Sequence, residues 1–468
     1  MPKKLITILF ASLLVLSLVL SACAPPPPAP TEEPEVVEEP EPTAEPVVEE
    51  EEMMLDLSGT TIAFWHVYGE GDPLSEVITP LVEEFNATNE WGITVEDFDQ
   101  EDYGPLEDKV NAGIQSGDLP QLVQAYTSAI NNWNLVDLVV DLETFVYDAD
   151  YGLTADELAD IYPTVLELGM TQSGQRLSWP LSQSANSMVY NISWAQELGF
   201  DAAPTNSAEL KEQLCAAAEA NLADDNPDND GGTGLVWYPN ANNLLGFIHA
   251  FGGDLLNDEG TAYEFNTAEV KAAAMFINDL RDSGCTFETE SYPNPEQANR
   301  LALVTLSSTS GLKYYGYAYA DGAFPDDNWG FLPFVGPEGG LGTDAYTQSL
   351  GIFKSTPEQE LASWLFLKFI TSAENQATWI EASGYLPTHF STEVMLADYI
   401  AAVPQYQSTM AIAQLGQTEP ETFTAWYSVR RAMSDAAAAL YAAEDGAAID
   451  AILAELDITA AELVTEVE

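Results

Sequence analysis

The sequence predicts an α/β fold in two domains, and three observations support this. About 410 of the 468 residues follow an N-terminal segment that cannot form a core, which is more than one ordinary hydrophobic core holds. Short apolar runs then alternate with amphipathic segments, an order typical of parallel strands connected by helices. Trp, Tyr and Phe make up 10% of the chain, which suffices for packed cores and for stacking surfaces.

The first part of the folded region has a β-α-β-α-β order. Asp72-Pro73 is typical of a helix N-cap followed by proline at the first position, and Gly117 is typical of a helix end. Ligands of such sheets gather outside the carboxyl ends of the strands. We expect strands at residues 59–66, 93–98 and 119–125, and helices at 74–86 and 106–115.

The later part mixes strands and helices without an internal repeat. Thr356 and Gln359 form a capping-box pattern at the start of one helix, and the alanine-rich tail from Phe423 predicts another. We expect strands within 179–191, divided by a polar patch at 182–186, and at 301–306, 329–334 and 350–353. Further helices are expected at 207–222, 241–251, 268–282 and 295–300, and after Pro357 and Ser372.

Residues 1–22 predict a secretory signal peptide. Lys3 and Lys4 precede the apolar run Leu5–Leu20, and Ser21-Ala22 supply small side chains before Cys23, as in a bacterial lipobox. The apolar run is shorter than the ~20 residues of a membrane-spanning helix, so an uncleaved anchor is the less favoured interpretation. We expect a protein anchored to the cell membrane by lipid on Cys23 and located outside the cytoplasm.

Residues 23–56 predict a tether between that lipid and the folded part. Pro25–Pro28 are followed by 11 glutamates between residues 32 and 52. Proline removes hydrogen-bond donors and the like charges repel, so no core can form there. A solvated spacer is therefore favoured over a cation-binding or wall-binding segment.

The charge balance narrows the classes of partner. The chain carries 76 acidic and 13 basic residues, a formal net charge of −63. Such a surface repels nucleic acid and anionic lipid, so neither is an expected partner. It also disfavours an anionic ligand unless the binding site supplies its own basic residues.

Cys215 and Cys285 remain after Cys23 is assigned to the lipid. An even pair in an oxidising compartment favours a disulfide, with two separate buried thiols as the alternative.

Several stretches, in their order and spacing, resemble extracellular solute-binding proteins of ABC importers, the sugar-binding relatives of maltose-binding and glycerol-3-phosphate-binding proteins. The matching stretches are Phe64-Trp65-His66, DYGPLEDKVNAGIQSGDLPQLVQAYTS, WPLSQSANSMVYN, FGGDLL, NRLALVTLSSTSG, GFLPFVGPEGG and SWLFLKFITSAENQATWIEASGYLPTH. The resemblance implies a two-lobed periplasmic-binding-protein-like fold of type II, with the ligand between the lobes and closure on binding. We expect lobe 1 to comprise 57–176 plus 301–347, and lobe 2 to comprise 177–300 plus 348–468.

The resemblance also carries over site positions. The glycerol-phosphate branch uses a tyrosine where this chain has Tyr103, serines matching Ser184 and the turn 307–310, and a tyrosine matching Tyr385. It has an acid where this chain has Thr127, and a phosphate-binding arginine in a region that has no basic residue here before Arg430. These two departures favour a neutral carbohydrate, expected to be an oligosaccharide, over glycerol 3-phosphate or a glycerophosphodiester.

Carbohydrate sites need aromatic platforms and side chains that both donate and accept hydrogen bonds. Each candidate also has a structural interpretation: core packing for the aromatic residues and His66, and turn capping for the serines. The full set of expected ligand-binding residues is Trp65, His66, Tyr103, Thr127, Ser184, Trp237, Ser308, Ser310, Tyr385 and Trp426.

One acidic loop has the alternating oxygen ligands of a calcium loop at Asn226, Asp228 and Asp230. Its twelfth position is Trp237, so the bidentate glutamate is missing, and a solvated turn is the favoured interpretation. We expect no cofactor, with a structural calcium ion as the weaker alternative.

The expected function is capture of a small-molecule sugar and its delivery to the membrane permease of an ABC importer, by a monomer. A secreted glycoside hydrolase and a surface adhesin are the competing classes. With this many acidic residues, paired carboxylates carry no weight as evidence for a hydrolase, and no nucleophile-elbow or metalloprotease motif is present in the sequence.

Overall fold

The computed structural model describes residues 55–467, except 70, 71, 172, 228, 230, 290, 414 and 422. The predicted signal peptide, Cys23, all but the last two residues of the tether, Asp228 and Asp230 lie outside the described residues. Leu55–Glu468 forms one compact unit. In the described ranges, no helix is both long enough and apolar enough to cross a membrane.

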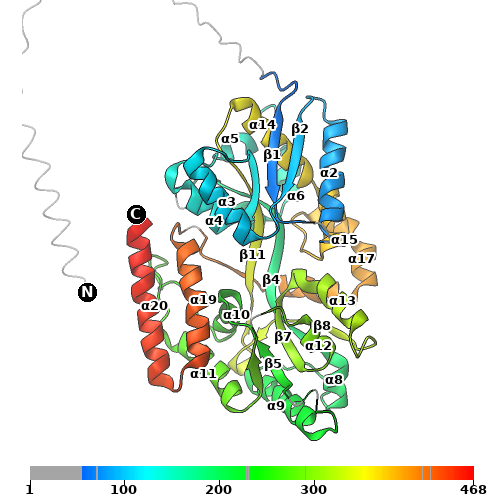
Figure 1. Ribbon diagram of the computed structural model, residues 1–468, viewed down its shortest axis with the longest axis vertical. Helices are drawn as coiled ribbons and strands as arrows, with labels where there is room; N and C mark the ends of the chain where they lie inside the picture. The colour runs from blue at the N-terminus through cyan, green and yellow to red at the C-terminus, as the bar shows by residue number, and fades with distance from the viewer. Residues whose placement is uncertain are drawn as a thin grey trace, which may run out of the picture. The chain divides into compact units, whose positions relative to one another are not determined.

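The unit is a mixed α/β structure (Figure 1). Its strands are β1 Thr61–His66, β2 Thr94–Asp99, β3 Leu122–Tyr126, β4 Trp179–Asn191, β5 Thr233–Trp237, β6 Thr286–Glu288, β7 Ala302–Ser308, β8 Trp329–Leu332, β9 Phe334–Val335, β10 Leu341–Gly342, β11 Asp344–Ile352 and β12 Gln417–Thr418. Its longer helices are α2 Ser75–Thr88, α3 Tyr103–Ser116, α9 Ser207–Ala223, α10 Ala241–Ala250, α11 Ala268–Asp282, α13 Leu312–Asp321, α14 Pro357–Ile370, α15 Ala373–Ser383, α18 Pro404–Ala413, α19 Trp426–Ala442 and α20 Gly446–Val467. Its shorter helices are α4 Thr127–Trp133, α5 Glu143–Val146, α6 Ala155–Asp160, α7 Pro163–Glu167, α8 Ile192–Glu197, α12 Asn294–Ala298, α16 Phe390–Met395 and α17 Ala397–Ala402.

The main sheet has the strand order β2-β1-β3-β11-β4-β7-β5-β6, with β12 beside β11 and β8 beside β4. The flanking pairs β1–β2, β1–β3, β5–β6 and β5–β7 are parallel, as predicted. The centre differs, because β11 runs antiparallel to β3 and β4, and β4 runs antiparallel to β7 and β8. The parallel strands predicted from the β-α-β-α-β order are confirmed for β1, β2 and β3, and the centre of the sheet adds antiparallel strands to them.

β4 is one continuous strand of 13 residues and not the two predicted strands. The polar patch that was expected to divide it is buried and paired: Trp379 Nε1 donates to Ser182 Oγ at 2.7 Å, and Asn186 Nδ2 donates to Asn243 Oδ1 at 2.8 Å. Small polar side chains with buried partners can continue a strand. The alternation of apolar and polar residues along the strand does not show these partners, because Trp379 and Asn243 are far from β4 in the sequence.

Two large hydrophobic cores lie on either side of this central region. One contains Phe64 and Trp364, and the other contains Trp237 and Met433. β4 contributes Trp179 to the first core and Met188 to the second, so a single strand connects them. In Figure 1, β4 and β11 run between the two groups of helices.

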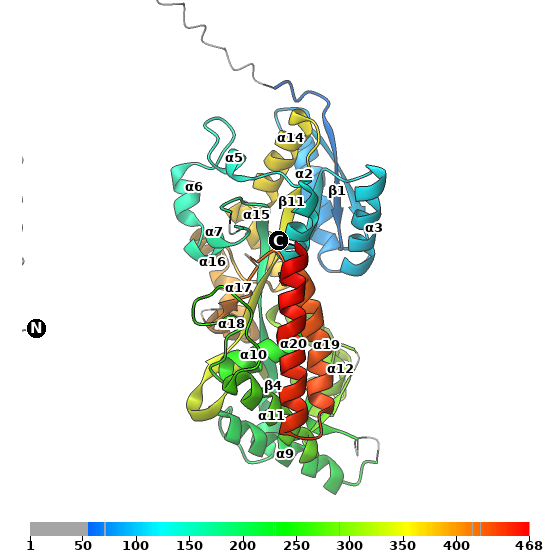
Figure 2. The same ribbon diagram turned by 90° about the vertical axis from the view of Figure 1, so that its left-hand side faces the viewer.

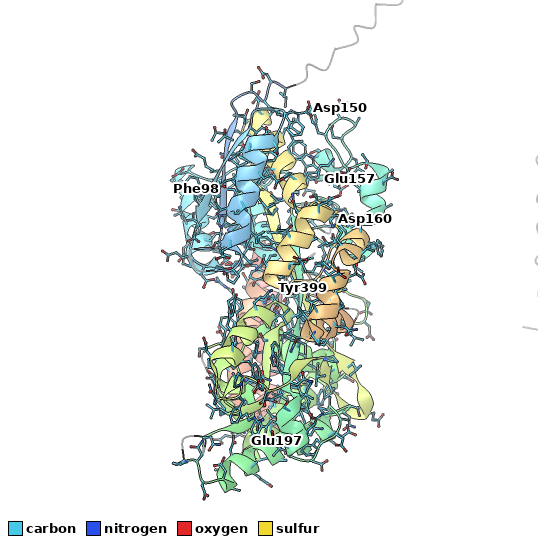
Figure 3. All side chains as sticks on the ribbon, turned by 90° about the vertical axis from the view of Figure 1, so that its right-hand side faces the viewer. Phe98, Asp150, Glu157, Asp160, Glu197 and Tyr399 are labelled. Carbon is cyan, nitrogen blue, oxygen red and sulfur yellow. A yellow bond between two sulfur atoms is a disulfide. The ribbon has the colours of Figure 1, made fainter. Side chains whose placement is uncertain are left out.

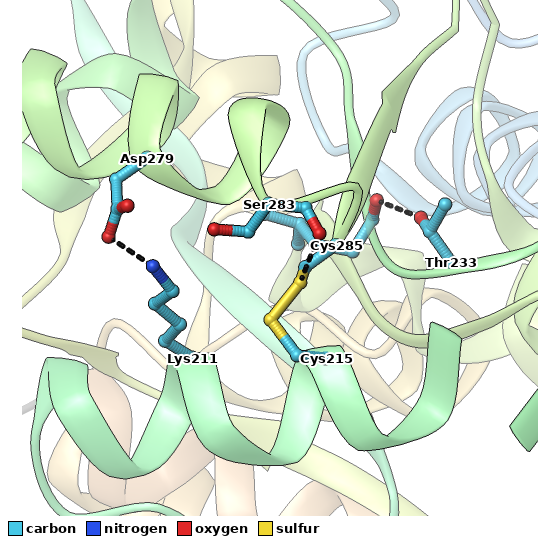
Figure 4. The surroundings of a disulfide bond; sticks show 7 residues. Lys211, Cys215, Thr233, Asp279, Ser283 and Cys285 are labelled. Atoms are coloured by element: carbon cyan, nitrogen blue, oxygen red, sulfur yellow. Dashed lines mark hydrogen bonds and ion pairs between the residues drawn. A yellow bond between two sulfur atoms is a disulfide. The ribbon is translucent and has the colours of Figure 1, made fainter. Parts of the chain in front are cut away.

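Cys215 of α9 and Cys285, which follows α11, are joined by a disulfide (Figure 4). Lys211 on α9 also pairs with Asp279 on α11, with Nζ 2.5 Å from Oδ2. The predicted disulfide is therefore present, and not two separate thiols. It connects α9 to the end of α11.

Helices α19 and α20 lie side by side in both views (Figures 1 and 2). Asn278 Nδ2 on α11 donates to the carbonyl of Ala443, just after α19, at 3.0 Å. The N-terminal turn of α19 carries Trp426 and Arg430, which belong to the polar site described below.

Candidate ligand-binding site

Tyrosine rings from three elements meet where the central strands end. Tyr103, the first residue of α3, stacks on Tyr126 at the end of β3, with 4.6 Å between ring centroids. Tyr346 of β11 presents its ring edge-on to Tyr126 at 6.4 Å. Offset aromatic pairs of this kind form a wall with apolar faces and polar rims.

Amides hold these tyrosine hydroxyls in place. Gln348 accepts from the Tyr68 hydroxyl at 2.6 Å through Oε1, and its Nε2 donates to the Tyr103 hydroxyl. Gln124 Nε2 donates to the same Tyr103 hydroxyl at 3.0 Å. Burial raises the pKa of Tyr126 to about 12, and burial also raises the pKa of Tyr103, so both hydroxyls stay protonated at neutral pH.

Serine hydroxyls border the tyrosines on the side of β7. Ser308 Oγ accepts from the backbone N–H of Ser310 at 3.2 Å and lies 2.8 Å from Ser310 Oγ. Ser184 of β4 lies opposite Tyr346 of β11 in the paired strands. A cavity of about 40 Å³ lies against Ser310 and Tyr385, next to Tyr314.

A guanidinium lies on the other side of the tyrosines. The centre of the Arg430 guanidinium is 5.8 Å from the Tyr126 ring centroid. Its Nε is 2.9 Å from Glu419 Oε1 and 3.1 Å from Glu419 Oε2, and its NH2 group donates to Asn242. Trp426 Nε1 donates to the same carboxylate at 2.6 Å. The positive charge is therefore paired within the protein.

Two further carboxyl groups lie beside this pair. Asp344 Oδ2 accepts from Asn242 Nδ2 at 2.6 Å, and burial followed by the charge of Glu419 raises the pKa of Asp344. Burial, again followed by Glu419, raises the pKa of Glu421 to about 8. Three carboxyl groups thus lie around one arginine.

Most of the predicted residues lie in this site. The structure brings together Tyr103, Thr127, Ser184, Ser308, Ser310, Tyr385 and Trp426. Tyr103 was expected in a loop and instead begins α3, capped by Asp102. Thr127 also bonds to Ser178 and Ser349, so it supports the site from beneath.

The other three predicted residues are in the interior. The Trp65 ring packs in a core with Val123 and lies under Lys109 Nζ at 4.1 Å. His66 is 2% exposed and stacks on Tyr68 at 5.7 Å. Trp237 is 0% exposed and packs in the core that contains Met433. All three are buried, with Trp65 beside Lys109 and His66 Nε2 3.8 Å from Asp97, and their contact with a ligand stays a prediction.

Sequence reasoning missed the residues that complete the site. Asp344, Tyr346 and Gln348 alternate along β11, so they share one face of that strand, and this spacing is a readable signal. Asn242, Glu419 and Glu421 come from loops and a helix start, with no comparable pattern. Arg430, the first basic residue after that region, also lies in the site.

The comparisons with known proteins agree with this architecture. The family described as bacterial extracellular solute-binding protein matches residues 80–408. The sn-glycerol-3-phosphate-binding periplasmic protein UgpB of Escherichia coli K12 is 26% identical over 348 residues, covering 70% of this chain and 74% of that protein. Two solved structures each superpose with a TM-score of 0.71 and cover 87% of this chain. One is the GacH receptor of Streptomyces glaucescens, studied unliganded and with acarbose, which is 16% identical and covered over 98% of its own chain. The other is UgpB of Mycobacterium tuberculosis with glycerophosphocholine, which is 19% identical and covered over 99% of its own chain.

The chain belongs to the bacterial extracellular solute-binding protein family. It is a solute-binding protein of an ABC importer, with the two-lobed fold of that class, and its relatives are binding proteins and not enzymes. The family also places it outside the cytoplasm. These points confirm the resemblance, the fold class and the general function expected from the sequence.

A second, larger cavity of this solute-binding protein lies elsewhere. It has a volume of about 1050 Å³, and Asp150, Glu157 and Asp160 line it, on one side of the view in Figure 3. Lys368 Nζ lies 3.4 Å from Glu157, and Ser391 N–H donates to Asp160 at 2.9 Å. The carboxylates of Glu157 and Asp160 are therefore paired within the protein. In the tyrosine site, by contrast, Gln124 Oε1 is buried without a hydrogen-bond partner.

The predicted calcium loop is not supported in the part of the chain that the structure describes. No group of three or more His, Cys, Asp or Glu side chains that could hold a metal occurs there. Of the proposed ligands, only Asn226 is within the described residues.

Proposed function

We propose that this solute-binding protein captures a carbohydrate, expected from the sequence to be a neutral oligosaccharide, and delivers it to the permease of its importer. The observation that carries the proposal is the stacked pair Tyr103–Tyr126, with Tyr346 beside it and serine hydroxyls and glutamine amides at its rims. Sugar rings offer apolar faces to aromatic rings and hydroxyl arrays to such polar groups.

The charge of the site disfavours an anion. Arg430 lies 5.8 Å from the Tyr126 ring centroid, and Glu419 already neutralises it. Burial raises the pKa of Asp344 and of Glu421, so these carboxyl groups stay protonated at neutral pH and supply no positive charge to attract a phosphate or carboxylate. The structural neighbour from Streptomyces glaucescens, studied with acarbose, supports a carbohydrate ligand by likeness of fold.

We further propose that two lobes close on the ligand. The limits expected from the sequence were 57–176 plus 301–347 and 177–300 plus 348–468, but Trp364 packs in the core of Phe64 and Val304 packs in the core of Trp237. These shared cores favour 350–370 in the first lobe and 302–335 in the second. The continuity of β4 and β11 through the sheet supports a hinge in these strands. In this proposal, Cys23 carries the lipid, residues 23–56 tether the monomer to the membrane, and ligand is taken up between the lobes.

A glycerophosphodiester is the second candidate. Arg430 at the Tyr126 ring could contact a phosphate if Glu419 turned away, and the UgpB relatives include one solved with glycerophosphocholine. This candidate requires the 2.9 Å Arg430–Glu419 pair to break on binding.

Calorimetry and thermal unfolding of the full chain with neutral oligosaccharides, glycerol 3-phosphate and peptides test the proposal. A ligand at ~100 times its Kd should raise the free energy of unfolding by ~2.7 kcal/mol. We expect stabilisation by a carbohydrate, and Tyr126→Ala should reduce it. Stabilisation by phosphates or peptides alone contradicts the ligand class, and hydrolysis of a bound sugar contradicts the assignment as a binding protein.

A further inference from the structure

One carboxylate connects the two helices whose first residues belong to the ligand site. Glu107 lies on α3, one helical turn after Tyr103, and its side chain is 13% exposed. The hydroxyl of Tyr427 on α19 donates to Glu107 Oε2 at 2.6 Å, and NH2 of Arg431 lies 3.6 Å from the same oxygen. Tyr427 directly follows Trp426, so the contact lies one residue away from the site on α19.

The two helices belong to different hydrophobic cores. Leu106 of α3 packs in a core with Trp65 of β1, whereas Val429 of α19 packs in the core of Trp237. Tyr427 differs from Val429, because its ring packs against the core that contains Trp65. The contact between α3 and α19 therefore crosses between the two parts that the proposed closure brings together.

The hydrogen bond from Tyr427 to Glu107 has the length of a charge-assisted bond. Burial, followed by the hydrogen bond and the charge of Glu107, raises the pKa of Tyr427, so its hydroxyl keeps the proton that it donates. Arg431 contributes less, because its side chain is 68% exposed and exposed ion pairs are weak. The strength of the contact therefore comes mainly from the tyrosine.

We infer that Glu107 is a positioning residue of the ligand site, which holds α19 against α3 through Tyr427 when the lobes close. The inference rests on the proposed function and adds to it a contact that the ligand does not make. Tyr103 and Tyr126 form the side of the site next to α3, and Arg430 lies on the side of α19. A contact made in the closed form raises the closed fraction, and the apparent affinity for a ligand of that form rises with the fraction.

A tyrosine–carboxylate bond of the same kind elsewhere in the chain serves as a matched control. The hydroxyl of Tyr162 donates to Glu393 Oε2 at 2.8 Å. Tyr162 packs against the core of Phe64, and Phe390, on the same short helix as Glu393, meets its ring at 4.5 Å between centroids. This bond does not connect α3 to α19, so its loss should leave closure unchanged.

Calorimetry of the full chain with maltotriose and with glycerophosphocholine, probes of the two candidate ligand classes, tests the inference. Glu107→Gln and Tyr427→Phe should each weaken binding of whichever probe binds by about threefold or more, because fewer molecules are closed. The double variant should bind no more weakly than the more affected single variant, since both changes remove the same contact. Tyr162→Phe should bind as the original chain does, and thermal unfolding checks that each variant folds.

Small-angle scattering without ligand supplies a readout that a merely structural role would not move. The radius of gyration should increase in Glu107→Gln and Tyr427→Phe, because more molecules are open, and should stay unchanged in Tyr162→Phe. Unchanged affinity in both single variants, or losses that add in the double variant, overturns the inference and leaves the proposed function standing. If neither probe binds the original chain, that result counts against the proposed function, and an unchanged radius of gyration in both single variants then overturns the inference separately.

Discussion

The guanidinium of Arg430 and the carboxylate of Glu419 form a two-point contact, with Nε 2.9 Å and 3.1 Å from the two carboxylate oxygens. Glu419 also receives a hydrogen bond from Trp426, which fixes its orientation. This pair decides the charge that the site shows to a ligand. It turns the strongest phosphate-binding group of the site into an internal counter-ion.

Arg430→Met should destabilise the protein at pH 8 by about 2–4 kcal/mol. It leaves Glu419 buried beside two other acids without a cation, and breaking a buried pair costs more than an exposed one. The arginine side chain keeps 26% of its surface exposed, which places the effect below that of a fully buried pair. Urea unfolding measures it.

The double variant Glu419→Gln/Arg430→Met is the control and should recover most of the lost stability. If the single variant is as stable as the original chain at pH 8, Glu419 and Arg430 do not form the pair in solution.

Glu421→Gln should stabilise the protein at pH 9 and leave it unchanged near pH 4. The pKa of Glu421 is raised from 4.5 to about 8, so the native state favours its neutral form. The contribution of neutral Glu421 to the free energy of unfolding is fully present below pH 4.5 and is lost as the pH rises through about 8. The loss is roughly 3–5 kcal/mol, since each pKa unit corresponds to about 1.4 kcal/mol.

Thermal unfolding of the original chain and of the Glu421→Gln variant across pH 4–9 measures this difference, and acids that do not interact with Glu421 cancel in the comparison. A constant gap between the two curves at every pH contradicts a raised pKa. Glu157→Gln, at an acid whose pKa is lowered by hydrogen bonds from Thr154 and by Lys368 against the effect of burial, should show the opposite sign.

The sequence predicted the parts of this fold that are encoded locally. Alternating strands and helices, and the Thr356 cap, whose Oγ1 accepts from Gln359 N–H, were readable from spacing and residue type. The antiparallel position of β11 was not, because its pairing with β3 and β4 joins segments far apart in the chain. The same holds for the site, where Tyr103 could be found at a strand-to-helix turn but Glu419 and Asn242 meet only through tertiary packing. Burial also misleads sequence reasoning, since Trp237 at a strand end resembles a ligand platform but lies in the core.

Cys215→Ala/Cys285→Ala should lower the free energy of unfolding by about 3–4 kcal/mol. The disulfide closes a chain segment of 70 residues, and its removal enlarges the conformational freedom of the unfolded state. Urea unfolding with and without reductant measures the effect. The original chain in reductant should approach the stability of the double variant, and a double variant of unchanged stability contradicts a structural role for the bond.

Tyr126→Ala should weaken ligand binding at least tenfold with little loss of stability. Its ring stacks on Tyr103 at 4.6 Å and meets the edge of Tyr346, yet the side chain is only half-buried at the end of β3. An aromatic contact is worth about 0.5–1.5 kcal/mol beyond the area that it buries, and its removal also takes that area from the ligand. Tyr126→Phe, which keeps the ring, should retain most of the affinity. Calorimetry with the best-binding ligand separates the two, and equal losses in both variants would show that the hydroxyl of Tyr126, and not its ring face, holds the ligand.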